Sequence, residues 1–170
     1  MKKTNKSAND PESSLGFSIM KAILFLFVTT LVFSISVIIF YEGRKAYWDS
    51  KVEELCQKKG GVRIYEKDSI SKKYVERDGT VSIPFEKNAT QEDDYCLRVT
   101  RNSIVDGRVS VGETKTELIR TKDNKVLAEF ITYGRSGGDF IALSHPSYYY
   151  CKTDNNPIDF MVSKVFLITD

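Results

Sequence analysis

The chain has 170 residues, which is enough for one domain and a membrane anchor but too few for two ordinary domains. From Glu42 to Asp170 the sequence carries 21 Lys and Arg and 21 Asp and Glu, so this part is formally neutral. Nucleic-acid-binding domains usually carry a basic excess. The charge balance therefore argues against a nucleic-acid ligand.

The first 16 residues are polar, and we predict a disordered tail at 1–16. An apolar segment follows at 17–41, and it carries no charge between Ala22 and Tyr41. A helix of this length covers about 30 Å, the thickness of the hydrocarbon core of a bilayer. We therefore predict a transmembrane signal-anchor helix at 17–41, with the lipid bilayer as its surroundings.

Two other interpretations of this segment fit less well. A buried core helix would rarely be apolar on every face over such a length. A cleaved secretory signal has a shorter apolar core, about 7–15 residues, and a small-residue cleavage site after it. The segment after Tyr41 reads EGRKAYW and offers no such site.

Positive charges flank the apolar segment on both sides, so their count does not fix its orientation. The charges are Lys2, Lys3, Lys6 and Lys21 before it, and Arg44, Lys45 and Lys51 after it. All three cysteines lie on the C-terminal side, which suits an oxidising compartment. We predict a cytoplasmic N-terminus and an exported C-terminal domain.

The helix is expected to continue beyond the apolar segment, because 42–59 contains no proline. The apolar residues of this juxtamembrane helix recur at the spacing of one helical face, and Gly60-Gly61 supplies a stop signal. They are Trp48, Val52, Leu55 and Cys56. We predict that this stripe packs on the exported domain.

The residues after Gly60 show the alternation that is typical of strands. The predicted strands lie at 61–67, near 74–75, near 81–85, and at 95–101, 110–121 and 125–134. The last two form the clearest antiparallel hairpin, and Asp78-Gly79 predicts a turn that reverses the chain.

Near the C-terminus, Asn156 and Pro157 are typical of an N-cap and a first helical position. The apolar residues that follow predict a helix, with a strand at 160–168 as the alternative. The expected fold class is α+β: a transmembrane helix that continues into a small antiparallel β-sheet domain, 60–170, with a C-terminal helix.

The three cysteines are Cys56, Cys96 and Cys151. In an oxidising compartment two are expected to pair and one to remain. A Cys56–Cys151 bridge would tie the domain to the juxtamembrane helix, with Cys96 as a buried free thiol; the alternative is that all three are reduced. The cysteines are not spaced as C-x-x-C and there is a single histidine, so we expect no metal site and no cofactor.

The segment YGRSGGDFIALSHP holds several polar and charged side chains beside two glycines. A Ser/His hydrolase with Ser136 or Ser144 and His145 is conceivable, but no G-x-S-x-G elbow is present, and no catalytic residue is predicted. We expect glycines with positive φ and an Arg135–Asp139 ion pair or backbone capping. If the segment is functional, we expect a recognition loop. Its residues are Arg135, Ser136, Gly137, Gly138, Asp139 and His145.

A run of three tyrosines follows, in which Tyr148 and Tyr150 share one side of an extended chain and Tyr149 faces the other. We predict that these rings pack in the core. A platform for carbohydrate or peptide is the alternative.

The N-terminal layout, SLG-FSIMK before an apolar helix and a cysteine-containing β domain, resembles type IV pilins and pseudopilins. Those proteins have glutamate at the fifth mature position, whereas this chain has Lys21. A pilin-like assembly subunit is therefore an alternative, and processing before Phe17 would be its signature.

The segments ELCQKKGGVRIYE and YGRSGGDFIALSHPSYYYC resemble a group of uncharacterised proteobacterial and prophage inner-membrane proteins with a short anchor and an exported domain. Its recurring cysteines fall on Cys56 and Cys151, so the resemblance implies that these two pair. It also implies a bacterial inner membrane and a periplasmic domain, but no reaction. The leading hypothesis is a non-enzymatic periplasmic domain that binds a protein partner in the envelope.

Overall fold

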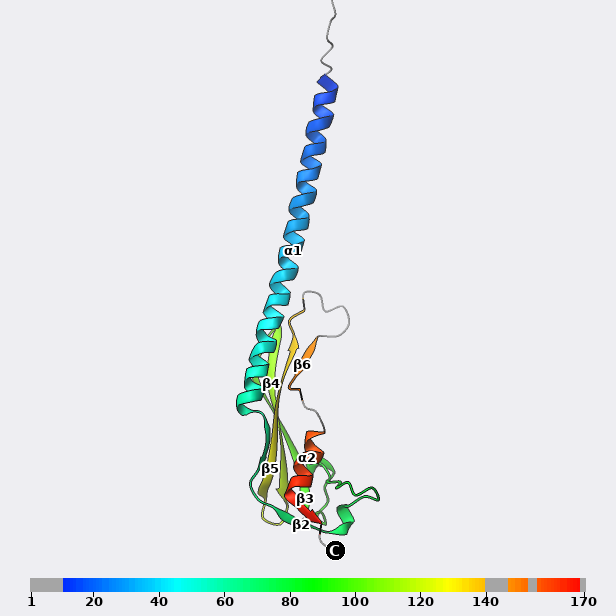
Figure 1. Cartoon of the computed structure of the whole chain (residues 1–170), viewed down its shortest axis with the longest axis vertical. Helices are drawn as coiled ribbons and strands as arrows, with labels where there is room; N and C mark the ends of the chain where they lie inside the picture. The colour runs from blue at the N-terminus through cyan, green and yellow to red at the C-terminus, as the bar shows by residue number, and fades with distance from the viewer. Residues whose placement is uncertain (1–10, 140–146, 153–155, 169–170) are drawn as a thin grey trace, which may run out of the picture. The chain divides into compact units, whose positions relative to one another are not determined.

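The computed structural model describes residues 11–139, 147–152 and 156–168. The chain divides into two compact units, Met1–Gly43 and Arg44–Asp170. Figure 1 labels the helices and strands along the chain. The α+β class is confirmed: a long apolar helix precedes an antiparallel sheet and a C-terminal helix.

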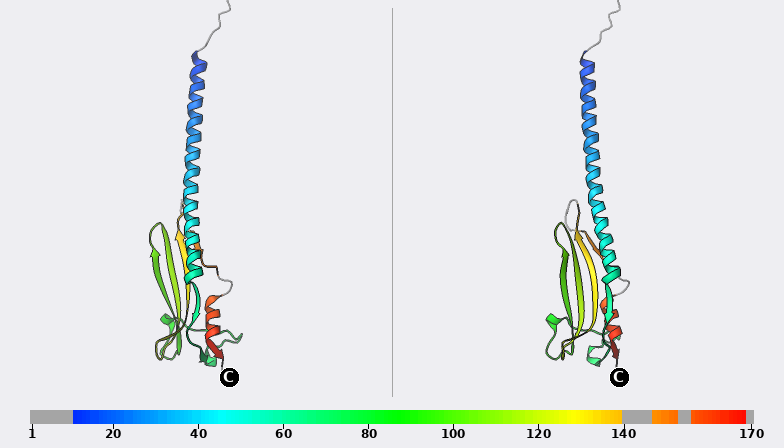
Figure 2. Two further views of the ribbon diagram at one scale, coloured as in Figure 1. Left: turned by 60° about the vertical axis from the view of Figure 1, so that its left-hand side comes forward. Right: turned by 90° about the vertical axis from the view of Figure 1, so that its left-hand side faces the viewer.

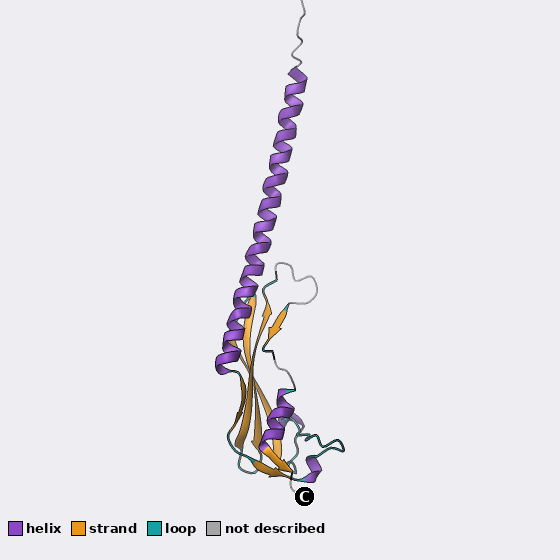
Figure 3. Ribbon diagram, viewed as in Figure 1, coloured by secondary structure: helices purple, strands orange, loops and turns teal. Residues whose placement is uncertain are grey.

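Helix α1 (Pro11–Lys59) is unbroken, as Figure 3 shows. It begins six residues before the predicted start, with proline at a position that needs no backbone N–H. From Phe17 onward it is long and apolar enough to cross a membrane. The Ser and Thr hydroxyls of its uncharged stretch, 22–41, are internally satisfied, since each donates to a carbonyl three or four residues back. They belong to Thr29, Thr30, Ser34 and Ser36.

The helix ends where the sequence predicts. The Gly60 N–H donates to the carbonyls of Leu55 and Cys56, both at 3.1 Å. An added Cβ on Gly60 would lie 2.7 Å from the Cys56 carbonyl oxygen, and Gly61 has a φ of +104°. The glycine pair therefore lets the chain turn sharply out of the helix and into the first strand.

The main sheet has the order β1-β5-β4-β3, with β6 also paired to β5, and all neighbours are antiparallel. The predicted hairpin is confirmed: its first strand begins and ends one residue earlier than predicted, and its second strand extends to Gly137. The strands are β1 (Gly61–Ile64), β3 (Tyr95–Val105), β4 (Val109–Arg120), β5 (Lys125–Gly137) and β6 (Tyr148–Tyr150). Figure 2 shows that this sheet is long and strongly twisted.

The two apolar cores use opposite faces of the sheet. One core contains Val111 and Tyr133 and packs against Val52 on the last turns of α1. The other contains Leu118 and Phe130 and packs against helix α2 (Pro157–Val165). Since residues of opposite parity on β4 and β5 point to opposite faces, each helix covers its own face and its own half of the sheet.

The predicted C-terminal helix is confirmed as α2, with the Asn156 side chain accepting from the Ile158 N–H and proline in the first turn. The strand alternative holds only for its end, since β7 (Phe166–Ile168) pairs in parallel with β2 (Asp68–Ile70). The side chains of Tyr95 and Phe166 stack edge to face at 4.7 Å and link this small sheet to the main one.

The two predicted short strands are reduced to isolated bridges: Val75 pairs antiparallel with Val81 around the predicted Asp78-Gly79 turn, but no regular ladder forms. Near 74–75 the chain forms the 3-10 helix η1 (Lys72–Tyr74), in which Tyr74 is buried and its hydroxyl accepts from the Asp94 N–H. Near 81–85 only isolated bridges occur, at Val81 and Phe85. Pro84 has no N–H to donate to a ladder, which explains the interruption. A second 3-10 helix, η2 (Glu86–Asn88), follows.

Candidate functional site

The predicted recognition segment lies at the end of β5 and directly after it. Arg135, Ser136 and Gly137 are the last residues of the strand, and Gly138 and Asp139 follow. Both glycines have positive φ, +81° and +94°, as predicted. His145, and with it Ser144, lies outside the described residues, so the hydrolase and the role of His145 stay predictions.

Arg135 links the strand to α1. Its guanidinium is 2 % exposed, and Nε donates to Asp49 Oδ1 at 2.5 Å. The Nη1 group donates to the Gly137 carbonyl and to Ser147 Oγ, the latter at 3.1 Å. A buried charge is tolerated only when it is paired and hydrogen-bonded. Arg135 therefore links β5 to α1 by buried polar contacts, and its guanidinium is not exposed for contact with a partner.

Asp139 also contacts α1, by a second ion pair. Its carboxylate lies 3.3 Å from Lys45 Nζ and accepts the Ser147 N–H at 2.7 Å. That backbone hydrogen bond, together with Lys45, lowers the pKa of the Asp139 carboxyl. The predicted Arg135–Asp139 ion pair is thus wrong, because each partner pairs with the helix; the predicted backbone capping is confirmed.

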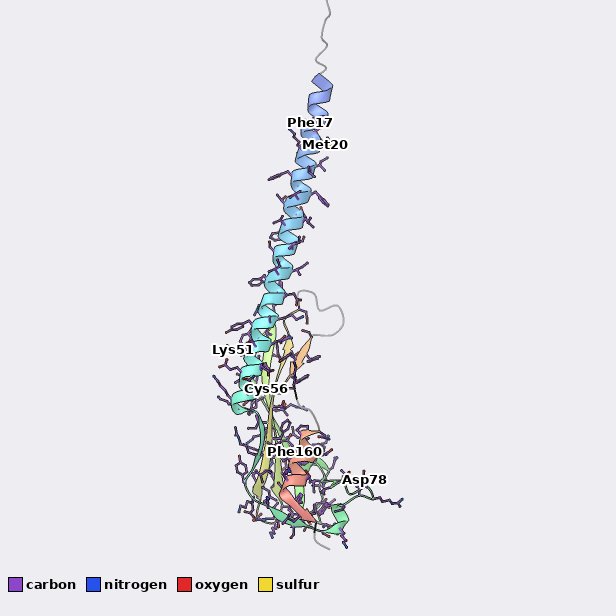
Figure 4. The ribbon with its side chains drawn as sticks, in the orientation of Figure 1. Phe17, Met20, Lys51, Cys56, Asp78 and Phe160 are labelled. Carbon is purple, nitrogen blue, oxygen red and sulfur yellow. A yellow bond between two sulfur atoms is a disulfide. The ribbon has the colours of Figure 1, made fainter. Side chains whose placement is uncertain are left out.

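The disulfide joins the same two elements. Cys56 on the last turn of α1, labelled in Figure 4, bridges to Cys151 directly after β6, with the Cα atoms 5.7 Å apart. The Tyr149 hydroxyl donates to Glu53 Oε2 at 2.8 Å. Cys96 is free and buried, and burial raises the pKa of its thiol. The pairing implied by the family resemblance is confirmed.

We call the set of contacts between residues 45–56 of α1 and the strands β4, β5 and β6 the helix–sheet junction. It combines the disulfide, two ion pairs and an apolar core around Val52, which is fully buried. The predicted apolar stripe does pack here. The polar partners Lys45, Asp49 and Glu53 were not predicted, although their i, i+4 spacing on one helical face was a usable signal.

Tyr133 lies at the same junction, almost wholly buried between β4 and the helix. Its hydroxyl donates to Glu113 Oε2 at 2.8 Å. Burial and this carboxylate raise the pKa of the Tyr133 phenol to about 12. The phenol therefore stays neutral over the whole physiological range.

The prediction that the tyrosine run packs in the core holds only for Tyr149, which is half-buried against the core around Val52. Tyr148 and Tyr150 are 56 % and 60 % exposed, and their rings are nearly parallel, at 8°, with centroids 6.1 Å apart. Tyr149 points to the opposite face, toward α1. Beside Tyr150 the sheet forms an open groove of about 480 Å³, lined mainly by β4 and β5.

Within the described residues, no group of three His, Cys, Asp or Glu side chains is placed to hold a metal ion. The candidate sites are the helix–sheet junction, whose contacts are internal, and the groove beside Tyr150, which is open to solvent. Comparison of the chain with family models, with curated proteins and with solved structures finds no significant match.

Proposed function

We propose that the chain is a single-pass protein of the bacterial inner membrane, with a cytoplasmic N-terminus and a periplasmic domain that binds a protein partner in the cell envelope. The observation that carries this proposal is the Cys56–Cys151 disulfide between α1 and the sheet. Structural disulfides persist in oxidising compartments such as the periplasm. The apolar helix supplies the anchor on the N-terminal side of that domain.

An open sheet edge supports partner binding. Among the described residues, β3 pairs with β4 along its length except at a bulge at Ile104, and its other edge is met only at Leu97, by the bridge from Phe85. From Val99 to Val105 no described strand pairs with the outer edge, and Ile104 is 50 % exposed. An unpaired edge of this kind accepts an extended segment of another protein as an added strand.

The family resemblance in two cysteine-bearing segments supports the bacterial setting, and it favours an accessory or prophage-encoded factor over a core component of the envelope. The proposal names no reaction.

Site-specific photo-cross-linking in intact cells tests partner binding. We expect a cross-linker at Ile104 to give one discrete protein adduct. The matched control is a cross-linker at Tyr65, which is 57 % exposed after β1. Adducts with lipid alone, or the same adducts from both positions, would contradict the proposed edge.

A topology reporter fused after Asp170 tests the location separately. A periplasm-dependent reporter is expected to be active and a cytoplasm-dependent one silent. The reverse pattern would remove the periplasmic assignment and the partner with it.

A further inference from the structure

One stretch of the sheet face opposite α1 carries only glycine and hydroxyl side chains on β4 and β5. Farther along the same face, Thr116 and Phe130 are buried where α2 packs. Toward the other end of the hairpin, the facing residues are only half-buried, and they form the floor of the groove. They are Ser110, Gly112, Thr114, Thr132, Gly134 and Ser136.

The two exposed tyrosines border this floor. Tyr148 pairs in register with Ser136 and Tyr150 with Gly134, so both rings rise on the same face as the hydroxyls. A Cβ added to Gly134 would lie 2.6 Å from Tyr150 Cδ1, so the ring of Tyr150 occupies the space above this glycine. The result is an aromatic wall beside a polar floor.

Gly112 has no comparable reason to be glycine. A Cβ added there would meet only the Asn102 carbonyl oxygen, at 3.5 Å, an ordinary contact. Its φ is not positive. Glycine within a strand weakens the strand, and it often marks a place where a ligand approaches the backbone closely. The floor at Gly112 is open to such an approach.

We infer that this groove binds a glycan, a chain of pyranose units, in addition to the protein partner proposed above. The C–H face of a pyranose ring packs on an aromatic ring, whose face is electron-rich. The hydroxyls of the sugar then pair with the Ser and Thr hydroxyls of the floor. A volume of about 480 Å³ falls within the usual range of small-ligand sites, about 300–1,000 Å³.

The lining argues against the other ligand classes. No side chain of the six floor residues is larger than threonine, so the floor offers no deep apolar cavity for a protein side chain, and its hydroxyls and backbone suit a sugar better. An added peptide strand would need a free edge of β5, which β6 occupies at this level. A phosphate group would need several cations, and the acidic lining residues Asp106 and Glu113 offset Arg101 and Arg135, the latter already paired with Asp49.

The test uses the full chain in lipid nanodiscs, because glycosidic detergents would compete for the groove. The probes are cellotetraose, maltotetraose and the tetramer of β-1,4-linked N-acetylglucosamine. Saturation-transfer NMR at up to about 10 mM probe detects weak binding, including complexes with dissociation constants in the millimolar range. We expect transfer to at least one probe. No transfer to any of the three would overturn the inference.

Three variants locate the binding. Tyr150→Ser removes the ring that lines the groove and is expected to weaken binding about threefold to tenfold. Gly112→Val adds a side chain to the floor and is expected to abolish binding of the glycan. The thermal midpoint of unfolding is expected to stay equal or to rise, because valine favours strands. Tyr65→Ser, at a tyrosine of matched exposure away from the groove, is expected to change nothing.

Binding that survives both groove variants would overturn the inference, because the sugar would then lie elsewhere. A discrete protein adduct from a cross-linker at Thr114 would also overturn it, since a protein would then occupy the groove. Neither result bears on the cross-linker at Ile104, so failure of the glycan site and failure of the protein partner are distinguishable.

Discussion

At the scale of single residues, the Arg135–Asp49 pair is the most consequential polar contact, because the guanidinium is buried. We predict that Asp49→Ala destabilises the domain by about 3 kcal/mol, since it leaves a buried charge without its counter-ion. The double variant Asp49→Leu/Arg135→Met should be less destabilised than the single one, because no charge is left unpaired. Urea unfolding followed by circular dichroism measures both.

The control for this prediction is the exposed Arg98–Glu86 pair, which has two hydrogen bonds from Nε and one from Nη2. Exposed pairs contribute little because water and salt screen them. Arg98→Ala should therefore lower stability far less than Asp49→Ala. Equal losses from the two variants would show that burial of Arg135 does not matter.

Two buried tyrosines make the stability pH-dependent. Burial first, and then a neighbouring carboxylate, raise the pKa of Tyr133 and of Tyr95 to about 12. An unfolded tyrosine titrates near about 10. Between these values the unfolded chain has lost its protons while the folded chain keeps them, so stability falls as the pH rises from about 10 to 12 and is fully present below about 10.

We predict a loss of about 2 kcal/mol per tyrosine across that window. The measurement is the urea midpoint between about pH 9 and 12. Tyr133→Phe, which cannot ionise, should reduce the pH dependence of the free energy of unfolding. An unchanged slope in that variant would contradict the assignment.

At the scale of elements, the parts that follow one local rule were predictable. The uniform apolar run and the Gly60-Gly61 stop define α1, and Asn156 with Pro157 defines the start of α2. The elements that failed depend on long-range contacts. Tyr74 is buried in the core beside Tyr95, and the chain forms a 3-10 helix there where a strand was predicted. Tyr148 and Tyr150 were predicted to lie in the core because the sequence does not show which face of a strand is covered by other elements.

The candidate sites show the same division. The disulfide partners were predictable from the family resemblance, and the positive φ of the two glycines from their sequence. The partners of Arg135 and Asp139 were not, because Asp49 and Lys45 lie more than 80 residues away on another element. The groove needs the register of β4 and β5, which fixes the six floor residues on one face.

The disulfide is the covalent tie between α1 and the strands, and it spans a sequence separation of 95 residues. In the chain-entropy model, closing a loop of this length stabilises a domain by about 4–5 kcal/mol. We predict a loss of that order for the double variant Cys56→Ala/Cys151→Ala. Cys96→Ala should keep the bridge, which a non-reducing peptide map would show. A peptide map of the unaltered chain that showed Cys96 in a disulfide would contradict the Cys56–Cys151 pairing.

At the scale of the whole molecule, the C-terminal compact unit begins at Arg44, inside α1, and not at the glycine pair where the helix ends. The last turns of α1 supply the fully buried Val52, the disulfide partner Cys56 and the counter-ion Asp49. Without them, the sheet face that carries Val111 and Tyr133 would be exposed to water. The last turns of α1 are therefore part of the core of the domain as well as the end of the long apolar helix.

This boundary gives a direct prediction. A chain that starts at Gly43 should be soluble and monomeric and should unfold in one cooperative step, because it keeps the complete helix–sheet junction. A chain that starts at Gly61 should aggregate, because it loses the junction and exposes an apolar sheet face. Size-exclusion chromatography and urea unfolding compare the two chains. If the shorter chain were monomeric and as stable as the longer one, the prediction would be wrong. Neither the last turns of α1 nor the disulfide would then contribute to the stability of the domain.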